Sequence, residues 1–75
     1  MNISVLVTDG QGHPRVNYEV IIQWSRGVSS ERTNDSGQAS FSYDGGTIES
    51  ISVEGRTVLN GPVIYDRSQS LTVTY

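Results

Sequence analysis

The chain has 75 residues, a formal net charge of −3 and no cysteine, and 35% of its residues are aliphatic or aromatic. A chain of this length forms one domain at most, with a thin core, because it buries only about 60% of the surface that the unfolded chain exposes. It has no disulfide, and its five cations, all arginine, are scattered among eight acids, which argues against binding of nucleic acid or of an anionic membrane.

Membrane insertion is not expected, because no segment approaches the run of about 18 apolar residues that spans a bilayer. The first ten residues, MNISVLVTDG, contain no basic region and precede no small-residue cleavage site, so they do not resemble a signal peptide. We therefore expect either a chain made without a signal peptide or one module of a longer protein.

Strand-forming residues dominate the chain and glycines interrupt it, which predicts strands and no helix longer than one turn. A first strand is expected over residues 2–8, followed by the turn DGQGHP. The longest strand is expected from about Val16 to Ser25. The side chains on its apolar face are Tyr18, Val20, Ile22 and Trp24.

The middle of the chain predicts one weak strand and one clear strand. Residues 27–33 are polar, which indicates a loop with a weak strand at the edge of a sheet. After the turn TNDSG, the side chains of Ala39, Phe41 and Tyr43 alternate with polar ones, which is typical of a half-buried strand.

The strand expected from Thr47 to Glu54 contains an irregularity. Ile51 and Val53 share one face, whereas Ile48 falls on the other, and a bulge near Glu49 or Ser50 would bring all three together.

Two tight turns are expected at Glu54-Gly55 and Asn60-Gly61, the second from a dipeptide that is among the strongest hairpin signals. The last strand points Leu71, Val73 and Tyr75 inward. About seven short strands predict a single all-β domain over residues 1–75, a small antiparallel β-sandwich. No connection is long enough for a parallel crossover.

Two turn patterns resemble those of a known group of domains. The first is Gly12-x-Pro14 between an apolar alternating strand and a second apolar strand, VNYEVIIQW, and the second is Thr33-Asn34-Asp35-x-Gly37-x-Ala39-x-Phe41. Together they resemble carboxypeptidase regulatory-like, or transthyretin-like (prealbumin-like), seven-stranded domains, in which V-x-D-x-x-G-x-P and T-D-x-x-G-x-F mark the first and middle turns. The resemblance covers about the first 43 residues, and the remainder agrees in strand number and length only. Bacterial Ig-like adhesin modules of the invasin kind and Cna-type B repeats carry nearly the same signature. The chain has no lysine, which excludes the Lys–Asn isopeptide bond of many Cna-type B domains.

The resemblance implies an Ig-like or transthyretin-like β-sandwich that serves as a non-catalytic accessory or adhesion module. It also implies an extracellular, cell-surface or virion-associated setting.

Catalytic and metal sites find little support in the sequence. The only histidine, His13, lies beside Pro14 in a turn, and no motif supplies it with a nucleophile or an orienting carboxylate. We expect no enzyme, no catalytic residue and no cofactor. Four aspartates lie in predicted turns, where they cap backbone amides; turns that converge at one end could instead hold Ca²⁺. These aspartates are Asp9, Asp35, Asp44 and Asp66.

Trp24 has two interpretations. It shares the parity of Val20 and Ile22, which predicts a place in the core. The alternative is a sugar-stacking platform of Trp24, Tyr65 and Tyr75, since sugar C–H faces pack on aromatic rings.

The leading hypothesis is a structural spacer or a protein-interaction and adhesion domain, which binds a protein partner or neighbouring domains. Exposed edges such as residues 27–33 would add a strand of the partner, or join copies of the chain into a weak homo-oligomer. The alternative hypothesis is a carbohydrate-binding module.

Overall fold

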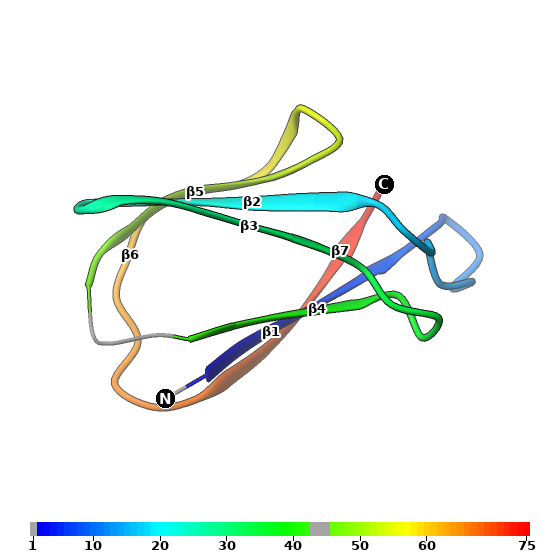
Figure 1. The fold of residues 1–75 in the computed structure, drawn as a ribbon, viewed down its shortest axis with the longest axis horizontal. Coiled ribbons are helices and arrows are strands. Elements are labelled where there is room, and N and C mark those ends of the chain that lie inside the picture. Colours follow the sequence, from blue (N-terminus) through cyan, green and yellow to red (C-terminus); the bar gives the residue numbers. More distant parts are fainter. Residues whose placement is uncertain (1, 43–45) are drawn as a thin grey trace.

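Seven strands form two sheets that pack face to face in a computed structural model, which describes residues 2–42 and 46–75 (Figure 1). The strands are β1 (Asn2–Thr8), β2 (Glu19–Trp24), β3 (Gly27–Arg32), β4 (Gln38–Ser42), β5 (Ile48–Val53), β6 (Arg56–Val63) and β7 (Gln69–Thr74). One sheet has the order β4-β1-β7 and the other β3-β2-β5-β6. The predicted all-β sandwich of about seven strands is confirmed, and no helix in the described part of the chain could cross a membrane.

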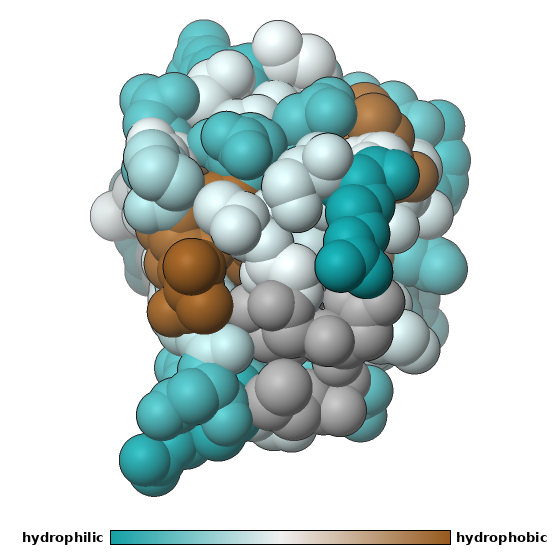
Figure 2. Space-filling model, turned by 90° about the vertical axis from the view of Figure 1, so that its left-hand side faces the viewer, coloured by the Kyte–Doolittle hydropathy of each residue, from teal (hydrophilic) through white to brown (hydrophobic). Residues whose placement is uncertain are grey.

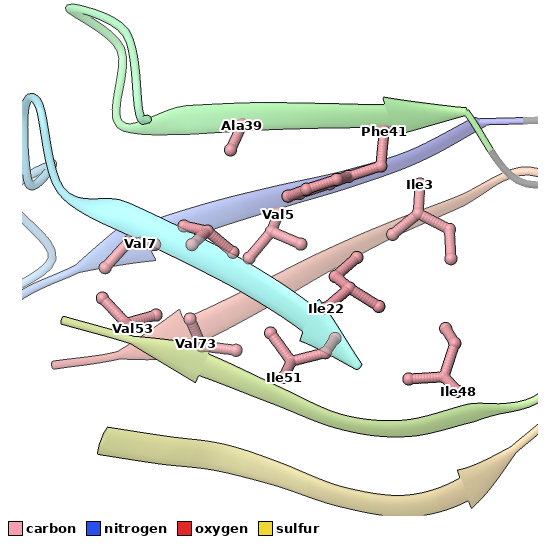
Figure 3. Packing of buried hydrophobic residues seen from close by; sticks show 11 residues of the cluster. Ile3, Val5, Val7, Ile22, Ala39, Phe41, Ile48, Ile51, Val53 and Val73 are labelled. Carbon is pink, nitrogen blue, oxygen red and sulfur yellow. The ribbon is translucent and has the colours of Figure 1, made fainter. Parts of the chain in front are cut away.

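The core lies between the sheets and consists of side chains that alternate along the strands (Figure 3). The buried apolar residues are Ile3, Val5, Val7, Val20, Ile22, Ala39, Phe41, Ile48, Ile51, Val53 and Val73. The predicted inward faces of β1, β2, β4 and β7 are therefore confirmed, with Leu71 and Tyr75 half-buried. Tyr43, also predicted to point inward, lies outside the described residues.

One pair of strands differs from the expected antiparallel arrangement. β1 and β7 are parallel, from Ile3 opposite Gln69 to Thr8 opposite Thr74. A parallel pair needs a long connection, and here all the intervening strands form it. The expectation of purely antiparallel pairing is wrong at this pair, because it considered only neighbouring segments of the chain.

β2 begins at Glu19 and not near Val16 as predicted. Asn17 has a φ of 62°, in the left-handed region, which interrupts an extended strand. β3, by contrast, is a complete strand with regular pairing to β2, so the weak edge strand expected here is confirmed and the loop is not.

The predicted bulge is present in β5. Gln23 lies opposite Ser50, whereas the next residue, Trp24, lies opposite Ile48. Glu49 is therefore the extra residue, and it shifts Ile48 onto the buried face.

Of the two tight turns predicted after β5, one is confirmed and one is wrong. Glu54 and Gly55 have φ angles of 49° and 84° and connect β5 to β6, as in turns with two left-handed residues. Asn60-Gly61 forms no hairpin, because β6 continues through it. A Cβ on Gly61 would overlap the carbonyl oxygen of Ile48, so this glycine permits close backbone approach.

Candidate interaction surface

The carboxylate of Asp9 organises the first turn. Its Oδ1 accepts hydrogen bonds from the backbone N–H groups of Gln11 (2.8 Å) and His13 (2.9 Å), and its Oδ2 lies 3.3 Å from His13 Nδ1. The N–H of His13, followed by that of Gln11, lowers the pKa of Asp9 below its usual value. The side chain of His13 is 71% exposed, and these hydrogen bonds of Asp9 all lie within the turn. We therefore interpret both residues as stabilising the turn.

The remaining acids of the predicted turns do not converge. Asp35 is exposed in the second turn, where the Oδ1 of Asn34 accepts the N–H groups that close the turn. Asp66 lies 3.6 Å from Arg67 in an exposed pair, and Asp44 is outside the described residues. Within residues 2–42 and 46–75, no three histidine, aspartate or glutamate side chains could together hold a metal ion.

The three aromatic residues proposed for carbohydrate binding do not lie together. Trp24, at the end of β2, packs partly against the core, and its indole Nε1–H donates to Ser29 Oγ at 3.0 Å. Tyr65 follows β6 at this same end, where Val63 pairs with Ile48 and Ile48 pairs with Trp24. Tyr75 lies at the opposite end, because it contacts Tyr18, which precedes β2. The six residues of β2 span about 20 Å and separate Tyr18 from Trp24.

The end of the sandwich near Tyr75 carries a cluster that the sequence analysis did not predict. The rings of Tyr18 and Tyr75 pack edge to face, with centroids 5.4 Å apart. The guanidinium of Arg15 lies 5.7 Å from the Tyr18 centroid and donates to the Tyr75 carbonyl at 2.8 Å and 3.2 Å, and that of Arg56 lies 5.1 Å from the Tyr75 centroid. The alternation of apolar residues predicted that both tyrosines point inward. Their contact with each other depends on the parallel β1–β7 pair, which no local pattern predicts.

The two outer strands of the four-stranded sheet have different inner faces. The inner face of β3 is polar, since Ser29 lies opposite Ile22 and the exposed Glu31 lies opposite Val20. The inner face of β6 is apolar, since Leu59 lies opposite Ile51 and Val63 lies opposite Ile48. Leu59 and Val63 are only half-buried.

Exposed apolar side chains occur in several places, whereas half-buried ones concentrate on β6, on β7 and on the residues that follow these strands. Figure 2 shows the end of the sandwich that is on the left in Figure 1, where brown apolar surface forms two separate areas. Among the described residues, the most exposed large apolar side chains are those of Ile64 (70%) and Val28 (61%). Most half-buried apolar side chains around the core also belong to β6, to β7 or to the residues that follow these strands. They are Val58, Leu59, Val63, Tyr65, Leu71 and Tyr75.

No protein-family model matches this chain, and no curated protein sequence matches it.

Proposed function

We propose that the chain is a non-catalytic β-sandwich module that holds or joins proteins, as an interaction domain or as a spacer. The observation that carries this proposal is the set of open sheet edges. Among residues 2–42 and 46–75, β3 and β7 each offer a complete strand with regular pairing on one side only. Such edges are templates for a strand from another protein.

The exposed apolar side chains of Val28 and Ile64 support the same proposal, since they lie on or beside outer strands. The resemblance to carboxypeptidase regulatory-like and transthyretin-like domains supports it further. The two segments that carry this resemblance both contain tight turns. The side chain of Asp9 closes the first turn and that of Asn34 closes the second. We propose that the chain belongs to this group of accessory modules and works beside a larger extracellular, cell-surface or virion protein.

The test is site-specific photo-crosslinking in a lysate of the organism that encodes the chain. Benzoylphenylalanine replaces Val28 on β3 or Ile64 beside β6 and, as a matched control, the exposed Gln23 on the outer face of the central strand β2. We expect discrete protein adducts from positions 28 or 64 and none from position 23. The proposal is wrong if positions 28 and 64 yield no adduct beyond the control.

A further inference from the structure

β7 is the least protected outer strand of the sandwich. Proteins usually blunt exposed strands with charge, proline, bulges or short length. β3 ends in Glu31 and Arg32, β6 contains Pro62 and two register shifts, and β4 has five residues. β7, with the sequence QSLTVT, has no charge, proline or glycine, and pairs with β1 without a shift.

The hydrogen-bonding groups on the free side of β7 can be assigned. The Tyr75 N–H donates to the Thr8 carbonyl, so Tyr75 faces β1. Because backbone groups alternate in direction along a strand, Val73 and Leu71 also face β1. The N–H and C=O groups of Ser70, Thr72 and Thr74 therefore point away from β1.

The space beside β7 lies under an apolar strand. β3 and β4 lie next to each other at one side of the sandwich, so the fourth strand of the larger sheet, β6, extends past β7 at the other side. In Figure 3, β6 (yellow-orange) runs at the margin of the core, beyond β7 (salmon). An additional strand on β7 would cover the half-buried Leu59 and Val63 of β6.

Positive charge marks one end of this space. Arg56 lies over the Tyr75 ring, and Arg15 binds the Tyr75 carbonyl. Among the described residues, no aspartate or glutamate side chain forms an ion pair with Arg56. A ligand that extends along β7 to Tyr75 therefore meets the guanidinium of Arg56, which lies over the Tyr75 ring.

We propose that β7 binds an extended segment of a partner protein as an antiparallel fourth strand of the three-stranded sheet. The segment is uncharged along β7, has apolar side chains opposite Leu71 and Val73, and has an acidic residue at its N-terminal end, beside Arg56. This inference rests on the proposed interaction function and adds the site and the partner's chemistry. A second copy fits poorly, because two-fold pairing of β7 would bring the copy's own second sheet into the space of β6.

The probe is the acetylated and amidated peptide Asp-Thr-Val-Thr-Val-Thr, which places its Asp opposite Tyr75 and its Val residues opposite Val73 and Leu71. Binding is followed by amide NMR and hydrogen exchange of the whole chain. We expect saturable shifts and slower exchange at Ser70, Thr72 and Thr74. A Lys in place of the peptide Asp should weaken binding about two- to fivefold, as should Arg56→Gln for the Asp peptide.

Thr72→Pro removes an N–H that faces the free side and leaves the bonds to β1 in place, so it should weaken binding at least about tenfold. The matched control is Ser30→Pro on β3, where the N–H also faces outward because Ser29 and Glu31 pair toward β2, and which should bind normally. If Thr72→Pro unfolds the chain, the proposal is tested by two other measurements. These are the affinity of Arg56→Gln for the Asp peptide and the hydrogen-exchange pattern of the unmodified chain.

Protection at Val28, Ser30 and Arg32 in place of β7 would overturn the assignment. Sedimentation that reveals a dimer abolished by Thr72→Pro would also overturn it, with a second copy as the occupant. If the peptide leaves β7 unchanged while position 28 or 64 still gives crosslinks, the β7 site is wrong and the interaction function stands. If both experiments fail, both proposals are wrong.

Discussion

Thr33 is the only polar residue among the described positions with a buried side chain, at 4% exposure, and its hydroxyl joins two segments. Its Oγ1 donates to the Arg15 carbonyl at 2.6 Å and accepts the Tyr18 N–H at 2.9 Å. Thr33→Val keeps the shape and leaves both groups unpaired. Each unpaired group costs about 1–3 kcal/mol when fully buried. Both are partly buried, so we expect about 1 kcal/mol each, and a melting temperature lower by about 8–16 °C.

The assay is urea unfolding followed by Trp24 fluorescence, with two control variants. Thr33→Ser keeps the hydroxyl and loses one methyl group, which costs about 1 kcal/mol. Thr57→Val changes an exposed threonine on β6 and should stay within about 0.5 kcal/mol of the unmodified chain. From most to least stable, the variants should rank Thr57→Val, Thr33→Ser and Thr33→Val. A Thr33→Val variant as stable as Thr33→Ser would refute the role assigned to the hydroxyl.

Three further predictions concern the strand β6, the core and the first turn. Gly61→Ala should lower the free energy of unfolding by about 1–3 kcal/mol in urea titrations, because its Cβ would overlap the Ile48 carbonyl oxygen, whereas Gly10→Ala, where the added Cβ meets open space, should cost far less. Ile22→Val should cost about 0.5–1.5 kcal/mol in the same assay, since Ile22 is fully buried; no loss would contradict its central place in the core. The pKa of Asp9 is lower in the folded chain than in the unfolded chain, so its contribution to stability is present above pH 3.8 and is lost as the pH falls through the folded pKa. Asp9→Asn should therefore make the free energy of unfolding depend less on pH in acid. An unchanged pH dependence in this variant would contradict the role assigned to the Asp9 carboxylate.

The fold could be predicted in outline because it depends on local alternation. The parity of Ile3, Val5 and Val7 determines the buried face of β1 without reference to any other strand. The bulge at Glu49 could be predicted for the same reason, since an interruption of parity next to Ile48 has few other causes.

Features that depend on contacts between distant segments could not be predicted. Asn60-Gly61 is a strong turn signal by itself, but the glycine is required by the nearby backbone of β5. The cluster of Tyr18, Tyr75 and two arginines likewise depends on the pairing of the first strand with the last. The candidate binding site on β7 depends on the order of strands in both sheets, and no short motif encodes that order.

The parallel pairing of β1 and β7 also determines how the module responds to force. Asn2 begins β1 at one end of the sheet, and Tyr75 follows β7 at the opposite end, so tension applied between these residues pulls the two strands lengthwise past each other. In this shear geometry the hydrogen bonds of the pair bear the load together, whereas peeling would break them one after another. The β1–β7 pair should therefore resist extension when force is applied between residues 2 and 75.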